Sequence, residues 1–181
     1  MPVGNLPLPL GSVLTGQPEV IGSTVLTAIT NQIRFDFQPI YRAIFISMWA
    51  NNGTADLIYP QFRLNNDSGA NYQIAAIYAS DTSVADASLA NRTSMYNSAI
   101  LGGILTPQSL ITKSAAAVKA QYIDLQSGRS TGADIELGIV AAEWNNTTNL
   151  LNRIDAFATF FTSPTRYFGV GTSVTLWGFR L

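Results

Sequence analysis

Clusters of turn-forming residues divide the chain into short segments that favour β-strands. Asn, Asp, Ser, Thr and Gly gather at 51–53, 65–69, 127–132 and 145–149, where they suit tight turns. The segments rich in β-branched and aromatic residues are 24–30, 33–37, 40–50, 58–64, 72–79, 120–127, 133–144, 152–162 and 172–180. Short strands separated by polar turns are typical of an antiparallel β-sandwich or barrel.

Two stretches depart from this rhythm. Thr106-Pro107 has the form of a helix N-cap followed by Pro at the first helical position, and Ser114 to Gln121 is rich in helix formers. The sequence therefore predicts one short helix near 107–119. Residues 80–104 mix small apolar and polar side chains, and we expect them to form a long excursion outside the sheets.

The N-terminal segment, residues 1–22, carries no charge before Glu19 and is broken by prolines. Pro restricts the backbone to extended conformations, and exposed apolar residues usually pack against something. We therefore expect an extended arm over 1–22 that contacts its own domain or a neighbour, followed by one domain over 23–181. The arm residues expected to make these contacts are Leu6, Leu8, Leu10, Val13 and Leu14.

Composition excludes several classes of function. The chain has 181 residues, of which only 12% are charged, and its net charge is −1, so no basic field would attract nucleic acid. No apolar run is long enough to span a bilayer. Histidine and cysteine are absent, which removes the commonest general base and the thiolate ligands of metals. We expect no catalytic residues, no cofactor, no metal, and neither nucleic acid nor membrane as a partner.

Several predicted strands are apolar on both faces, although an isolated sandwich should be polar on its outer faces. In 40–50, one parity carries Ile44, Ile46 and Met48 while the other carries aromatic residues, and 152–162 and 172–180 behave similarly. Either loops of the same subunit or other subunits must cover the second face. We expect a homo-oligomer, with an interface that includes Tyr41, Phe45, Trp49, Phe157, Phe161, Trp177 and Phe179.

Three motifs resemble those of jelly-roll proteins found in tailed bacteriophage particles. They are F-x-x-G-x-S-x-x-L-W-G over 168–178, F-R-L-N-N-D-S-G-A-N-Y over 62–72, and W-x-x-T beginning at Trp144. The resemblance implies an antiparallel jelly-roll β-sandwich located in the virion. It also implies a non-enzymatic capsid decoration (cement) protein, favoured as a homotrimer, whose partners are the major capsid protein or other virion proteins.

Other interpretations remain open. An appendage head or receptor-binding module could recognise host glycans through the aromatic residues Tyr59, Tyr72, Tyr78, Tyr96, Trp144 and Tyr167. Asp134 and Glu136, with Glu143 nearby, could form the carboxylate pair of a glycoside hydrolase. The oxygen-rich loop 65–71 could bind calcium, although Asn and Asp favour such turns for backbone reasons alone.

Overall fold

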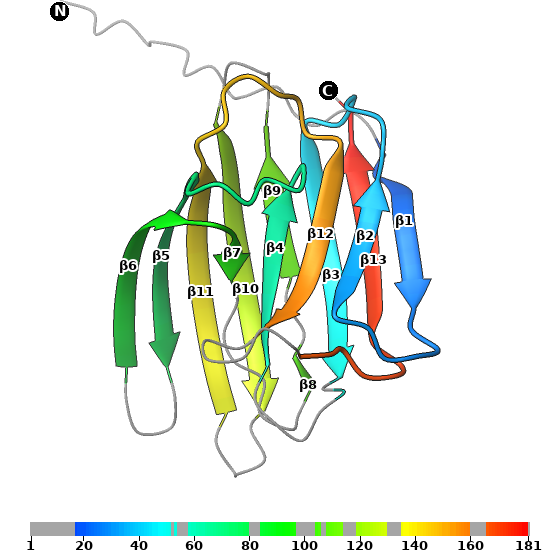
Figure 1. Ribbon diagram of the computed structural model, residues 1–181, viewed down its shortest axis with the longest axis vertical. Helices are drawn as coiled ribbons and strands as arrows, with labels where there is room; N and C mark the ends of the chain where they lie inside the picture. Colours follow the sequence, from blue (N-terminus) through cyan, green and yellow to red (C-terminus); the bar gives the residue numbers. More distant parts are fainter. Residues whose placement is uncertain are drawn as a thin grey trace, which may run out of the picture.

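The computed structural model describes residues 17–51, 53, 58–79, 84–96, 104–105, 108–113, 119–129, 135–159 and 166–180. These residues form strands, turns and irregular segments, and they contain no helix. No membrane-spanning helix is therefore found in this part of the chain. The predicted all-β class is confirmed, with two antiparallel sheets (Figure 1).

The larger sheet has nine strands in the order β1-β13-β3-β8-β10-β11-β5-β6, and β9 pairs with β3 and β10 alongside β8. The strands span Glu19–Val25 (β1), Ser173–Phe179 (β13), Ala43–Asn51 (β3), Ile104–Leu105 (β8), Gln108–Thr112 (β9), Ala120–Arg129 (β10), Ile135–Trp144 (β11), Tyr72–Ala79 (β5) and Val84–Arg92 (β6).

The smaller sheet has four strands in the order β2-β12-β4-β7. They span Gln32–Asp36 (β2), Arg153–Thr159 (β12), Tyr59–Leu64 (β4) and Met95–Tyr96 (β7). In Figure 1 this sheet lies in front of one part of the larger sheet, while β5 and β6 extend beyond it. The molecule is therefore a two-layer structure with layers of unequal width.

One apolar core joins the two layers. Ile44, Ile46 and Met48 of β3 are buried in the same cluster as Phe62 of β4 and Ile154 of β12. A ring-to-ring contact spans the layers, because Phe62 and Tyr122 of β10 lie with their centroids 6.2 Å apart. Burial of such large side chains is the main driving force holding the sheets together.

Eight of the nine predicted strands are present, with bounds that agree within about three residues in the described part of the chain, and β5 covers 72–79 as predicted. The strand predicted over 24–30 is wrong, because β1 spans Glu19–Val25 and overlaps it only at 24–25. The long excursion expected over 80–104 is wrong where the structure describes it, because β6, β7 and β8 pair within the sheets, while residues 80–83 and 97–103 lie outside the described part. Residues 19–22, expected to belong to the arm, are part of β1, which pairs with β13. Residues 17 and 18 of the predicted arm have no regular secondary structure, and residues 1–16 lie outside the described part of the chain.

The predicted helix near 107–119 is wrong where the structure describes it, because residues 108–112 form β9 between β3 and β10. Ser109 and Ile111 are buried while Leu110 is exposed, which is the two-residue period of a strand. Pairing on both sides and burial of Ile111 outweigh the weak helix propensity of the segment. Residues 114–118, the Ala-rich part of the prediction, are not described.

Candidate interaction surface

The side chains of the larger sheet that point away from the smaller sheet form a surface that we call the outer face. Even-numbered residues of β3 face the core, so odd-numbered ones such as Phe45, Ser47 and Trp49 point outward. In β13, the even-numbered residues, such as Val174 and Leu176, are buried and the odd-numbered residues are half-buried. Each strand therefore contributes one parity of its residues to the outer face.

The strand register aligns apolar residues of the outer face in one line across the sheet. We call this line the apolar row: Val20, Trp177, Phe45, Leu110, Ala141 and Ala75, ending opposite Ser88 on β6. Each residue pairs directly with the next, except that Leu110 and Ala141 are joined through position 123 of β10, with which both pair. The rings of Phe45 and Trp177 pack together with centroids 5.4 Å apart. Val20 is 61% exposed and Leu110 39% exposed, so the row remains partly open to solvent in a single copy.

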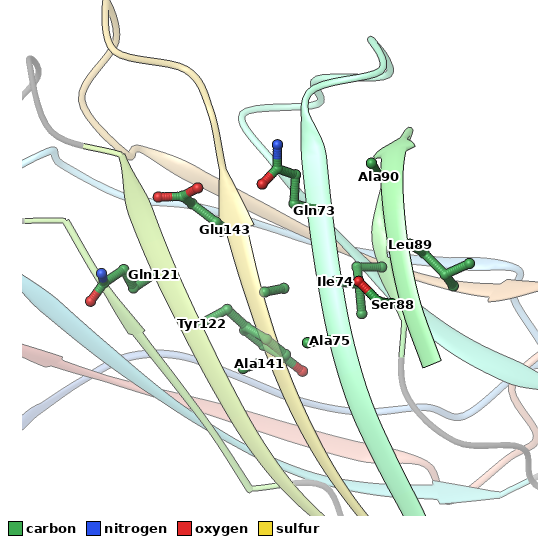
Figure 2. Close-up of a pocket in the computed structure, with 11 residues that line it drawn as sticks. Gln73, Ile74, Ala75, Ser88, Leu89, Ala90, Gln121, Tyr122, Ala141 and Glu143 are labelled. Carbon is green, nitrogen blue, oxygen red and sulfur yellow. The ribbon is translucent and has the colours of Figure 1, made fainter. Parts of the chain in front are cut away.

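A shallow hollow lies on the outer face over β11, β5 and β6 (Figure 2). Its surface includes the short side chains of Ala75, Ser88 and Ala141, and Gln73 and Glu143 stand at one end. Next to it, Ile77 and Ile139 are 54% and 47% exposed. Short side chains leave room for side chains of a partner, so this half of the outer face is suited to close packing.

Charges on the described outer face stand near its margins. Glu143 pairs with Lys119 at 3.0 Å, and Asp86 lies on the terminal strand β6. Arg180 and Glu19, which pair at 2.6 Å, lie beside Tyr41 at the end of β13 and not on the outer face. Depletion of charge at the centre with polar groups at the rim is the arrangement typical of protein interfaces.

The turn after β4 is held by a hydrogen-bond network centred on Asp67. Its carboxylate accepts hydrogen bonds from the Trp144 indole Nε1 at 2.7 Å, the Asn71 side-chain amide at 2.9 Å and the Gly69 backbone N–H at 2.9 Å. The buried Tyr72 hydroxyl donates to the Asp67 carbonyl at 3.2 Å. The 62–72 motif and the Trp144 motif are therefore in contact. Asp67 belongs to the first motif and accepts hydrogen bonds both from within it and from Trp144.

We expect protein stability to fall in acid through Asp67. Burial raises the pKa of this carboxyl, but hydrogen bonds from Trp144, Asn71 and Gly69 lower it by more, so its pKa lies below the ordinary value. A lowered folded-state pKa contributes stability above the unfolded-state pKa, and this is lost as pH falls through the folded value. Urea unfolding below about pH 4 should show this loss, which should be smaller in Asp67→Asn. Equal pH dependence in both proteins would contradict the assignment.

The structure places the predicted interface residues on different sides of the molecule. Phe45, Trp49, Trp177 and Phe179 lie on the outer face, where Trp49 is 45% exposed and the others are half-buried. Phe157 lies on the outward side of the smaller sheet, with the Arg63 guanidinium 4.7 Å from its ring centre. Leu6, Leu8, Leu10, Val13, Leu14 and Phe161 lie outside the described residues.

Tyr41 belongs to the core side and not with the other aromatic residues. Its ring packs against the core cluster and lies where a Cβ on Gly178 would be. It also meets Phe37 edge-on, with centroids 6.2 Å apart, and Arg180 lies over it. The strand predicted over 40–50 began three residues too early, because β3 begins at Ala43, so its alternation does not apply to Tyr41.

Replacing Gly178 with Ala should lower the free energy of unfolding by about 1–3 kcal/mol. The new methyl group would collide with the Tyr41 ring, which is held by Phe37 and Arg180. Chemical denaturation would measure the loss, and Tyr41→Ala combined with Gly178→Ala should show a cost smaller than the sum of the two single changes. Additive costs would contradict a collision with Tyr41.

The structure does not bring together the residues of the predicted sugar-binding platform, and it describes only part of the predicted carboxylate pair. Tyr72 and Trp144, proposed for a sugar-binding platform, are both fully buried, so that platform is wrong as drawn. Tyr167 is half-buried, and the side chains of Tyr59, Tyr78 and Tyr96 are not described. For the carboxylate pair, Asp134 and the Glu136 side chain lie outside the described part, while Glu143 is paired with Lys119. The third alternative was calcium binding by the loop 65–71. The Asp67 carboxylate of this loop instead accepts hydrogen bonds from Trp144, Asn71 and Gly69, which fits the turn that Asn and Asp favour.

Sequence reasoning missed the part of the outer face beyond β9. Leu110 was assigned to the predicted helix, and Ala75, Ile77, Ile139 and Ala141 were not singled out. Alternation within 72–79 and 133–144 could have assigned each of these residues to a face. Nothing in the sequence showed that β11, β5 and β6 would join the same sheet as β13.

Comparison with known proteins gives no relative for this chain: neither protein-family models, curated protein sequences nor solved structures match it significantly.

Proposed function

We propose that the two sheets form a jelly roll. When the eight strands of a jelly roll are lettered B to I along the chain, one sheet has the order B-I-D-G and the other C-H-E-F. The order β1-β13-β3-β9 corresponds to B-I-D-G, and β2-β12-β4-β7 corresponds to C-H-E-F. Every strand of the smaller sheet has a counterpart in this assignment, which supports it.

The remaining long strands are two insertions in this scheme. The hairpin β5-β6 lies between strands E and F, and the hairpin β10-β11 lies between G and H. Both join the B-I-D-G sheet, in the order β10-β11-β5-β6, beside β8 and β9. The insertions widen one face of the jelly roll and carry the apolar row further across it. A wide face of this kind suits contact with another large surface.

We further propose that the chain is a structural protein of a bacteriophage virion, a capsid decoration (cement) protein that works as a homo-oligomer, favoured as a trimer. The apolar row is the observation that carries this proposal, because a low-charge surface crossing a whole sheet is typical of an interaction site. The proposed location in a virion rests on the resemblance of three motifs to those of phage-particle jelly rolls. The Asp67 network supports this resemblance, since its hydrogen bond from Trp144 joins two of the motifs.

Binding to capsids lacking their decoration protein tests this function. Purified protein mixed with such shells should co-sediment with them and raise the temperature at which they open. Leu110→Asp and Trp49→Glu place charges on exposed outer-face positions and should reduce co-sedimentation at least tenfold without lowering the melting temperature of the protein itself. Ser23→Glu, at an exposed position near the edge of the sheet, is the matched control. Failure of the unaltered protein to bind would reject the proposal.

A second function is favoured by the shallow hollow on the outer face. Gln73, Gln121 and Glu143 offer amide and carboxylate groups beside the short side chains of Ala75 and Ala141. Polar groups next to an apolar surface can hydrogen-bond a sugar while its ring packs flat. A receptor-binding module would adsorb to host cells, and adsorption should then be lost in Gln73→Ala and Gln121→Ala. Adsorption without shell binding would favour this function over decoration.

A further inference from the structure

Strand β6 ends the larger sheet, and no strand in the described part of the chain pairs with its outer edge. Its nine residues include neither Lys nor Pro, which natural edge strands use to prevent pairing. From Val84 to Leu89 its register with β5 has no shift. The other edge strand, β1, is interrupted by an irregularity between Val20 and Gly22. β6 therefore presents the longer regular edge.

The direction of the free backbone groups on β6 follows from one hydrogen bond. The Asn145 N–H donates to the carbonyl of Asn71, the residue opposite it, at 2.9 Å. Backbone N–H and C=O groups alternate in direction along an antiparallel strand. Those of odd-numbered β5 residues therefore point toward β11, and those of even-numbered β5 residues point toward β6. Ala87 and Leu89, opposite Ala76 and Ile74, therefore bond to β5. The groups that face outward belong to Val84, Asp86 and Ser88, whose side chains lie on the outer face.

The sequence 5–10, Asn-Leu-Pro-Leu-Pro-Leu, has the pattern that such an edge requires. In an extended strand, alternate residues direct their backbone groups to the same side. Leu6, Leu8 and Leu10 can all bond toward β6, while Pro7 and Pro9, which lack an N–H, face away from it. Proline at the outward positions of a terminal strand costs no hydrogen bond and prevents further pairing.

We propose that residues 5–10 of one copy add to the β6 edge of a neighbouring copy as a further strand. The Leu side chains then lie on the outer face beside Val84, Asp86 and Ser88 and extend the apolar row by one strand. This rests on the homo-oligomer of the proposed function and not on capsid binding.

The edge belongs to a neighbour because a chain cannot reach its own. From β1 to β6 the sheet spans about 33 Å of strand spacing. Residues 11–18, which link residue 10 to β1, extend at most about 30 Å even when straight. The donor arm leaves one edge of the sheet and the acceptor is the opposite edge, so the contact is head-to-tail. A head-to-tail contact gives a closed ring when its rotation closes, and a trimer would be such a ring.

Disulfide trapping on the full-length protein tests this arrangement, because the natural chain has no cysteine. Leu8→Cys is combined in one chain with Val84→Cys, Asp86→Cys or Ser88→Cys, which covers the possible registers of the pair. After oxidation of the purified protein, at least one combination should convert most chains into disulfide-linked dimers and trimers on a non-reducing gel. Leu8→Cys with Ala87→Cys is the matched control, since Ala87 faces the other side, and it should cross-link at least about fivefold less.

The outcomes separate the alternatives. Disulfide-linked monomers would mean that the arm reaches its own β6, and they would overturn the proposal. Efficient cross-linking of Leu8→Cys with Ser23→Cys, and none with β6, would place the arm on β1 and also overturn it. No cross-linking at any position, in variants that melt like the natural protein, would show that the arm does not pair with this edge. Because no shells are used, none of these results bears on capsid binding.

Discussion

Replacing Trp144 with Ala should lower the free energy of unfolding by about 3–5 kcal/mol, the cost typical of removing a large aromatic side chain from a core. Trp144 is fully buried at the end of β11, and Lys113 Nζ lies 5.1 Å from its ring centre. Its indole N–H is also one of the donors that hold Asp67. Removal therefore leaves a cavity and loosens the turn after β4. Urea denaturation followed by circular dichroism would measure the loss.

Trp144→Phe separates the two contributions. Phenylalanine keeps most of the apolar volume but lacks the N–H, so it should cost about 1.5–3 kcal/mol, the range for a hydrogen bond to a charged group. Combining it with Asp67→Ala should cost less than the sum of the single changes, because both remove the same bond. A cost below about 1 kcal/mol for Trp144→Ala would mean that the 62–72 turn is held by other contacts.

Replacing Arg153 with Met should be similarly severe, at about 3–5 kcal/mol. Asp155, its partner on β12, has a fully buried side chain, and Arg153 donates to both carboxylate oxygens, at 2.7 and 2.8 Å. Gln32 Nε2, at 2.8 Å from Asp155 Oδ1, would remain as a donor. One neutral hydrogen bond does not compensate a buried negative charge, so the folded state loses stability.

The neighbouring strand offers a matched control. On β2, Arg34 and Asp36 form a pair with the same two-residue spacing, but both side chains are more than half exposed. Arg34→Met should therefore change the free energy of unfolding far less than Arg153→Met does. The double variant Arg153→Met, Asp155→Leu should recover most of the stability lost in Arg153→Met, since it leaves no buried charge. Equal costs for Arg153→Met and Arg34→Met would contradict the role of burial.

Local sequence patterns predicted much of the strand content and several of the turns. Segments rich in β-branched and aromatic residues between turn clusters identified β3, β5, β11, β12 and β13. Asn65 and Asn66 adopt positive φ angles of 54° and 56° in the predicted turn, which Asn tolerates better than most residues. Both effects depend on neighbours in sequence, which is why a single chain reveals them.

The candidate surface was only partly predictable. Phe45, Trp49, Trp177 and Phe179 were recognised because they lie opposite buried residues on otherwise apolar strands. Leu110 was not, since the Thr-Pro step and the Ala-rich stretch after it favoured a helix. Pairing with β3 and β10 reversed that preference. A propensity of a few tenths of a kcal/mol per residue yields to hydrogen bonding and burial on both sides.

The sequence by itself determined that the chain is all-β and low in charge, and that more than one strand is apolar on both faces. Only the tertiary structure decided that the hairpins β5-β6 and β10-β11 widen the same sheet that contains β1, β13 and β3. That sheet order places Val20, Trp177, Phe45, Leu110, Ala141 and Ala75 in one line. Strand alternation is a local property of the backbone, whereas pairing register joins residues far apart in sequence, and it is set by how the whole core packs.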